Sequence, residues 1–253
     1  MRAPGAISVF LAVFLAVLLL GTAEAARAGT ISGRVVFRGV LPVPAPIPVA
    51  KDREVCGDSV PSDALNVSPL TRGVQHAVVF LEGLTRSEDS PPPRETVLEN
   101  RACRFVPRVL AVQVGAELAI VNADPVLHNL RAWLPGRRHV FNVVQPTQGQ
   151  VTRRTVKRSG VMTLTCDTHV HMLGYLLAFD HPYFAVTDSD GGFSIPRVPA
   201  GTYRISAWHP GWSVIAQEPE GRVVYDAPHV LSREVAVPAA GEARVVFDLG
   251  PRP

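Results

Sequence analysis

The chain has 253 residues, 47% of them hydrophobic, which is enough apolar material for one large domain or two small ones with cores of their own. The net charge of +3 comes from arginine, because Lys51 and Lys157 are the only lysines. The densest basic stretch, residues 153–158, has no aromatic side chain between its charges. We interpret it as a solvated face, with docking of an acidic partner as the alternative, and we expect no nucleic-acid binding.

Residues 1–25 are predicted to be an export signal peptide. Arg2 supplies a positive start, residues 7–20 form an apolar run, and Ala23-Glu24-Ala25 fits a small-x-small cleavage site. The apolar run is shorter than the roughly 20 residues that a membrane-spanning helix needs. We therefore expect a mature chain that begins near Ala26, lies in the periplasm or outside the cell, and has no membrane anchor.

Most of the remaining sequence consists of short apolar runs separated by turn residues, and no stretch keeps a helical period over three turns. This pattern predicts an all-β fold. Proline-rich stretches at 42–48 and 87–93 cannot lie in central strands, and the second marks a module boundary. The predicted strands are 31–37, 77–81, 110–114, 118–122, 151–156, 161–165, 175–179, 184–187, 193–195, 203–208 and 243–249.

Three segments follow the signal: a β segment at 26–94, a middle module at 95–180, and a last module at 181–253. Residues 186–211, VTDSDGGFSIPRVPAGTYRISAWHPG, resemble the carboxypeptidase-regulatory-like, transthyretin-like sandwich, which is also grouped with carbohydrate-binding-like folds. The Gly-x-Val strand that opens this fold is missing just upstream but occurs far earlier, in ISGRVVFRG. We therefore hypothesise that residues 28–86 and 182–253 form one discontinuous sandwich around the middle module.

The chain has three cysteines, so in an oxidising compartment at least one of them stays unpaired. Cys166 is followed three residues later by a histidine, whereas Cys56 and Cys103 lie in ordinary polar contexts. We predict a Cys56–Cys103 disulfide and a Cys166 thiolate available for chemistry, although the sequence leaves the other pairings open.

The stretch CDTHVHM, residues 166–172, combines the ligand types of a type 1 copper centre, which needs two imidazoles, one thiolate and a weak axial thioether. Cys166 ends the apolar run VMTLTC, and His169 and Met172 follow it on a loop. A second imidazole, His128, lies just after the predicted strand 118–122. The spacing predicts a copper site formed by one loop and one distant strand end.

Residues 109–179 resemble a cupredoxin and are most similar to amicyanin. The motifs that carry this resemblance are Asn122, His128-Asn129 and Cys166-x-x-His169-x-x-Met172. It implies a Greek-key β-sandwich with one type 1 copper ion bound by His128, Cys166, His169 and Met172, and an Asn129 amide that ties the two ligand loops together. Nearly all of the mature chain resembles exported bacterial proteins of the methylamine-utilisation type, which join a cupredoxin-like domain to a regulatory-like sandwich.

Two positions depart from that group: Arg131 stands where a second histidine is common, and His171 stands where an aromatic residue precedes the methionine. We expect His171 to be an exposed loop residue outside the metal site. Simpler roles remain open for the ligands themselves, namely a buried thiol for Cys166, a hydrogen-bonded turn residue for His128 and core packing for Met172. The remaining histidines, at 76, 139, 181, 209 and 229, are interpreted as structural or exposed, and Asp188 and Asp190 as parts of a hairpin turn.

We expect no enzyme, because the sequence contains no hydrolase, zinc-protease or nucleotide-binding motif. Four side-chain ligands favour a one-electron carrier in which an exposed His169 faces a redox partner protein. One alternative is a structural module that binds a glycan or an envelope protein, with Trp208, Trp212 and Tyr203 stacking on a sugar. Another is copper storage or delivery.

Overall fold

The computed structural model describes residues 28–41, 43–85 and 91–251, so the predicted signal at 1–25 lies outside the described residues. Its elements are twenty β-strands and one helical turn, α1 (Arg53–Cys56), which confirms the all-β prediction. Nowhere in the described ranges does a helix have the length and hydropathy needed to cross a membrane.

Strands from both ends of the chain form one β-sandwich, here called the split sandwich. Strand β1 (Ala28–Phe37) lies between β15 and β20, so that Gly33 pairs with Phe193 on one side and with Val245 on the other. The two sheets have the orders β15-β1-β20 and β14-β4-β16-β19. The other bounds are β4 (Val78–Leu81), β14 (Phe184–Val186), β15 (Gly192–Pro199), β16 (Gly201–His209), β19 (His229–Val237) and β20 (Glu242–Leu249).

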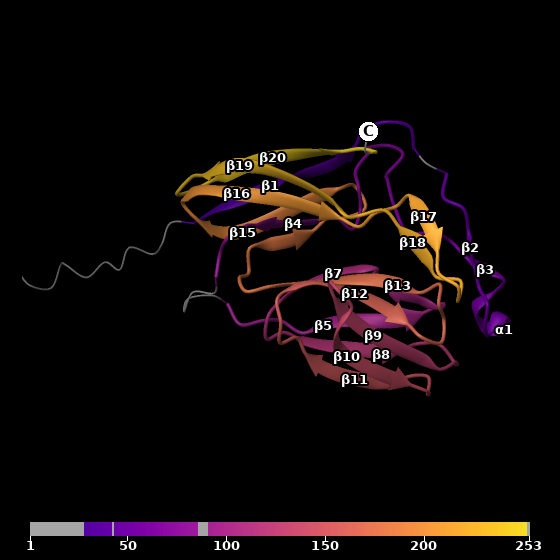
Figure 1. Cartoon of the computed structure of the whole chain (residues 1–253). Helices are drawn as coiled ribbons and strands as arrows, with labels where there is room; N and C mark the ends of the chain where they lie inside the picture. Colours follow the sequence, from indigo (N-terminus) through magenta and orange to yellow (C-terminus); the bar gives the residue numbers. More distant parts are fainter. Residues whose placement is uncertain (1–27, 42, 86–90, 252–253) are drawn as a thin grey trace, which may run out of the picture.

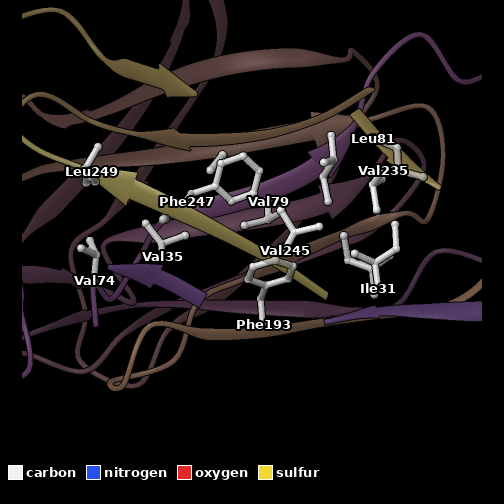
Figure 2. Packing of buried hydrophobic residues seen from close by; sticks show 14 of the residues in the cluster. Ile31, Val35, Val74, Val79, Leu81, Phe193, Val235, Val245, Phe247 and Leu249 are labelled. Carbon is white, nitrogen blue, oxygen red and sulfur yellow. The ribbon is translucent and has the colours of Figure 1, made fainter. Parts of the chain in front are cut away.

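The core of the split sandwich contains side chains from both of its sheets (Figure 2). Ile31 and Phe247 from the first sheet and Leu81 from the second are fully buried. Residues from before and after the middle module therefore share one hydrophobic core, and burial of these apolar side chains holds the two ends of the chain together.

The middle of the chain forms a second β-sandwich, here called the middle sandwich. Its sheets have the orders β10-β9-β12-β13-β7 and β11-β8-β5-β6. Their bounds are β5 (Thr96–Arg101), β6 (Arg104–Val106), β7 (Val109–Gln113), β8 (Glu117–Asn122), β9 (His128–Leu134), β10 (Arg138–Gln145), β11 (Val151–Thr155), β12 (Gly160–Cys166) and β13 (Leu173–Phe179).

The two sandwiches lie one above the other in Figure 1. Val78 and Trp208 from the split sandwich pack against Val109 and Leu177 from the middle sandwich in one buried cluster. Two smaller strand pairs lie at one end of the molecule: β2 (Ile47–Pro48) with β3 (Ser59–Val60), which flank α1, and β17 (Val214–Gln217) with β18 (Val223–Tyr225).

Strands β5, β6, β9, β10 and β19 and the two short pairs were not predicted, and in β9 and β10 polar residues interrupt the apolar pattern. In β9, HNLRAWL, five of the seven residues are buried although two of these five are His128 and Asn129. The polar start of this central strand is buried because it forms the candidate site. Pro48 forms part of the short pair β2-β3, in agreement with the prediction that residues 42–48 avoid central strands.

Candidate metal centre

His128 and Cys166 meet at one end of the five-stranded sheet of the middle sandwich. His128 is the first residue of β9 and Cys166 is the last residue of β12, and these strands are antiparallel neighbours in which Cys166 pairs with Leu130. The start of one antiparallel strand lies beside the end of the other, so residues far apart in sequence come together. His169 lies in the turn between β12 and β13.

Three donor atoms converge at this point. Sγ of Cys166 lies 4.0 Å from Nδ1 of His128 and 3.8 Å from Nδ1 of His169. All three residues are at least 99% buried, and each offers a ligand atom within 4.8 Å of those of the other two. The arrangement brings two imidazoles and one thiol to a single small volume, where one ion could contact all three.

Met172 lies in the same turn. Its N–H donates a hydrogen bond of 2.9 Å to the carbonyl oxygen of His169, which tightens the turn. Its side chain is 1% exposed and belongs to the same core cluster as Cys166. Core packing in the cluster that also contains Cys166 therefore accounts for its burial.

Carboxylates select the histidine tautomers. Nε2 of His128 lies 3.0 Å from Oδ2 of Asp124, and Nε2 of His169 lies 3.0 Å from Oδ2 of Asp52. An ionised carboxylate only accepts hydrogen bonds, so each Nε2 carries the proton and each Nδ1 keeps a lone pair directed toward Cys166. Paired carboxylates of this kind fix the ring orientation and raise the basicity of metal-binding imidazoles.

Burial favours the neutral forms of the side chains in this cluster. Burial lowers the pKa of His128 and of His169, although the neighbouring carboxylates oppose the shift. Burial also raises the pKa of the Cys166 thiol, while the N–H groups of Asn129 and His169, 3.4 and 3.3 Å from the sulfur, act in the opposite direction. A bound cation would favour the thiolate form of this thiol.

The structure corrects the expected position of His169 and His171. His169 is 1% exposed, because Asp52 and the segment around it cover the imidazole edge that the sequence led us to expect at the surface. His171 is 7% exposed, and its Nε2 lies 3.1 Å from the carbonyl oxygen of Cys103. The expected exposure was wrong for both residues because Asp52 and Cys103, which contact them, are distant in sequence.

Asn129 acts through its main chain where we expected its side chain to act. Its N–H donates to Sγ of Cys166, whereas its side-chain amide donates to Oδ1 of Asn142 at 2.8 Å. The contact that links the two ligand segments is therefore a backbone group. The side-chain amide of Asn122 donates to the carbonyl oxygens of Val126 and Gln145, which holds the segment just before His128 against the end of β10.

A disulfide links Cys56 to Cys103, the pairing that the sequence analysis favoured, and Cys166 is the free cysteine of the described residues. Val49 and Val60 pack around the disulfide in a small hydrophobic cluster. Cys56 ends α1, and Asp52 immediately precedes that helical turn. The bond therefore holds residues 49–60, here called the covering segment, against the middle sandwich, with Asp52 on His169.

A residue from the last part of the chain also contacts the turn between β12 and β13 that carries His169 and Met172, here called the ligand turn. Arg222, just before β18, donates to the carbonyl oxygen of Met172 at 3.2 Å and to that of Cys166 at 3.1 Å. Its side chain is 14% exposed and lies 3.6 Å from Glu218. The β17-β18 hairpin thus connects the split sandwich to the ligand turn of the middle sandwich.

Sequence reasoning missed Asp52, Asp124 and Arg222. Asp52 and Arg222 lie far from the ligand motif in sequence, and only the packing of three chain segments brings them to it. Asp124 lies four positions before His128 and could have been suspected on proximity, but the intervening residues are not helical, so spacing alone does not place it.

The residues proposed for sugar stacking are in structural roles. Trp208 is 5% exposed in the contact between the sandwiches. Trp212 stacks on His229 with ring centroids 3.9 Å apart, and the hydroxyl of Tyr203 donates to the carbonyl oxygen of Pro199. These side chains do not form a common platform.

The other predicted structural residues include three buried histidines, at 181, 209 and 229, and an exposed one at 139. Asp188 accepts hydrogen bonds from the N–H groups of Asp190 and Gly192, as expected for a hairpin turn. The exposed side chains of β11 agree with a solvated basic face, where Arg153 is within 3.5 Å of Glu95 and Glu117.

The donor set tests which ion would fit. Nitrogen from two neutral imidazoles and sulfur from a thiolate and a thioether suit copper, whose reduced state prefers sulfur and whose oxidised state accepts imidazole. Nδ1 of each histidine is directed toward the sulfur, and its other nitrogen is held by a carboxylate. The three donors that converge here, two imidazole nitrogens and one sulfur, therefore fit a copper ion.

Comparisons with known proteins match parts of the chain. Residues 157–224 match the family described as polysaccharide lyase family 4, domain II. Rhamnogalacturonate lyase B of Emericella nidulans (strain FGSC A4) is 33% identical over 79 residues, which make up 29% of this chain and 12% of that protein. The chain thus corresponds to a small part of that relative. Residues 157–224, which match the family, include strands of both sandwiches.

Similar solved structures are copper proteins that overlap with a third or more of the chain. A purple cupredoxin from Nitrosopumilus maritimus is 20% identical with a TM-score of 0.30, covering 33% of this chain and 98% of its own. A reduced Cu(I) form of an amicyanin variant is 16% identical with a TM-score of 0.31, covering 40% of this chain and 98% of its own. The copper-containing nitrite reductase of Thermus scotoductus SA-01 is 22% identical with a TM-score of 0.29, covering 38% of this chain and 24% of its own. These TM-scores are low, so a function can be inferred only from the donor atoms themselves.

Proposed function

We propose that this protein binds one copper ion through His128, Cys166, His169 and Met172 and carries single electrons. The observation that supports the proposal is the convergence of Nδ1 of both histidines on Sγ of Cys166, at 4.0 and 3.8 Å. A purely structural role does not require two imidazole nitrogens and a thiol to converge inside a core, whereas binding of one metal ion requires it.

Bound copper would supply a one-electron couple between Cu(I) and Cu(II). The protein contributes rigid positions for its donors, because β9 and β12 are paired strands and the Met172 N–H closes the turn that carries His169. Four side-chain ligands leave little room for a substrate. This favours a carrier over an enzyme, with a redox partner protein that supplies and accepts the electron.

We also propose that the protein works in the periplasm or outside the cell. The Cys56–Cys103 disulfide supports this location, because disulfides persist in oxidising compartments. The N-terminal sequence at 1–25 supports it independently. The copper ion would then be acquired after export.

Visible absorption of the mature protein after addition of Cu(II) tests the copper proposal. We expect an intense thiolate-to-copper band that is absent in Cys166→Ser and in His128→Ala and retained in His139→Ala, a matched control at an exposed histidine outside the site. A colourless, weakly bound ion would favour copper delivery. Absence of binding would contradict the proposal and favour a structural role.

A second candidate function, saccharide binding, is supported by the match of residues 157–224 to a polysaccharide lyase domain. A groove of about 650 Å³ between the two sandwiches is lined by Trp133, Tyr175, Arg131 and Arg137, among others. Aromatic rings suit stacking on a sugar ring, and the carboxylates of Asp167, Glu218 and Glu220 in the same groove balance its guanidinium groups, so a neutral sugar is the ligand to test. Calorimetric titration with a neutral oligosaccharide should give binding that Trp133→Ala weakens, and the absence of binding to the unaltered protein would rule this candidate out.

A further inference from the structure

The Cys56–Cys103 disulfide lies directly beside the candidate copper centre. Both sulfur atoms and a ring nitrogen of His169 lie within 4.8 Å of one another. Cys103 also belongs to a second group, in which its sulfur, a carboxylate oxygen of Asp124 and a ring nitrogen of His128 are equally close. All of these residues are buried. The disulfide is thus surrounded by potential metal donors, although a disulfide itself is a poor ligand.

We propose that reduction of the Cys56–Cys103 disulfide creates a second soft-metal site, in which two thiolates and the imidazole of His169 bind Cu(I). This site goes beyond the proposed electron carrier and shares only His169 with its ligand set. Two thiolates and one imidazole make a donor set that favours Cu(I) among copper states, because soft sulfur ligands stabilise the reduced ion.

The formation of the site balances as a thiol–disulfide exchange. A protein dithiol transfers two electrons and two protons to the Cys56–Cys103 bond, which becomes two thiols, and the dithiol becomes a disulfide. Binding of Cu(I) then displaces the two thiol protons to solvent, because thiolates are the metal-binding form. The copper ion keeps its Cu(I) state throughout.

The two cysteines are held differently, which allows them to separate once the bond is broken. Cys103 is fixed from two sides: its N–H donates to Asp124 at 2.9 Å, and its carbonyl oxygen lies 3.1 Å from Nε2 of His171. Cys56 ends a four-residue helix between the two-residue strands β2 and β3. The N–H of Cys56 donates to the carbonyl oxygen of Asp52 at 2.9 Å, so its backbone bond lies within the covering segment and moves with it.

Access to the bond is also asymmetric. Cys56 is 9% exposed, whereas Cys103 is fully buried. An attacking thiolate would reach the sulfur of Cys56 first and release the thiol of Cys103, which already lies beside His169 and His128. Because the disulfide is buried, the reducing protein has to displace the covering segment before it can reach the bond.

Anaerobic titration with Cu(I) in a Cys166→Ser background tests the site, because this change removes the thiolate of the first centre. We expect the reduced chain to bind one Cu(I), with both Cys56 and Cys103 shielded from alkylation, and the oxidised chain to bind far more weakly. His169→Ala in the reduced background should weaken binding by roughly tenfold or more, about 1.4 kcal/mol. His139→Ala should leave it unchanged.

Two results would overturn the proposal: equal Cu(I) affinity of the reduced and oxidised forms, or an affinity that does not respond to His169→Ala. Peptide-by-peptide alkylation of the reduced wild-type chain, with and without Cu(I), gives the same answer if the variants fold poorly. The proposed copper carrier is tested separately, by the visible absorption of the wild-type protein with its disulfide intact after addition of Cu(II). Absence of the thiolate-to-copper band there would contradict the carrier and not the second site.

Discussion

Oδ2 of Asp52 lies 3.0 Å from Nε2 of His169, although the two residues are 117 positions apart. Asp52 adopts a left-handed backbone conformation, with φ of 55°, at the start of α1. The disulfide four positions later ties this segment to the middle sandwich. A residue of the covering segment thus orients a predicted ligand of the middle sandwich.

Replacement of this carboxylate should weaken copper binding. In Asp52→Ala the imidazole of His169 loses the partner that fixes its tautomer, and outer partners of this kind typically contribute about 10–100-fold to metal affinity. Competition titration with a copper chelator measures the change. Asp58→Ala, in the same segment with a side chain that is 92% exposed, is the control and should bind copper like the wild type.

Arg222 should tune the reduction potential of the proposed centre. Its guanidinium donates to the carbonyl oxygens of Cys166 and Met172, so it places a positive charge close to the donors. A nearby positive charge favours the reduced ion, and Arg222→Met should lower the potential by on the order of tens of millivolts. Arg137→Met, whose side chain is 80% exposed, is the matched control. An unchanged potential in Arg222→Met would show that the contact is only structural.

Gly33 should be essential for the split sandwich. A Cβ atom at this position would lie 1.7 Å from the carbonyl oxygen of Val245 and 2.8 Å from the ring of Phe193. Because the first of these is a backbone atom between paired strands, Gly33→Ala should cost about 1–3 kcal/mol or more of unfolding free energy. Denaturant unfolding measures the loss. Arg244→Ala, on the neighbouring strand with an 82% exposed side chain, should change it by at most about 0.5 kcal/mol.

The buried His209 should make the protein sensitive to acid. Burial lowers the pKa of this imidazole from 6.5 to about 3, so the unfolded chain binds a proton that the folded chain resists. Stability from this group is complete above pH 6.5 and falls as the pH drops toward 3. The unfolding free energy of the wild type should therefore decrease relative to His209→Gln by about 1.4 kcal/mol per pH unit in this window.

Urea unfolding at a series of pH values measures this difference. The exposed His139→Gln variant should follow the wild-type profile. Parallel profiles for the wild type and His209→Gln would show that the imidazole is protonated in the folded protein, contrary to its burial at 2% exposure.

The sequence by itself determined the local features of this protein. Alternating apolar residues and turn signals predicted strands such as β8, β12 and β16, because the period of two and the turn residues are properties of neighbouring positions. The spacing of Cys166, His169 and Met172 indicated the ligand turn for the same reason. The Gly-x-Val strand in ISGRVVFRG pairs with β15 and β20 in the structure. The sequence indicated this pairing because the last module has no such strand just upstream.

Only the tertiary structure decided what surrounds those ligands. Asp52, Asp124 and Arg222 hold the two imidazoles and the ligand turn, and two of them come from segments far away in the sequence. The burial of His169 depends on Asp52 in the covering segment, and the proximity of the disulfide to His169 depends on the bond that joins Cys56 of that segment to Cys103. Such contacts arise from long-range packing, and no local pattern in the sequence encodes which distant side chain will fill a given place.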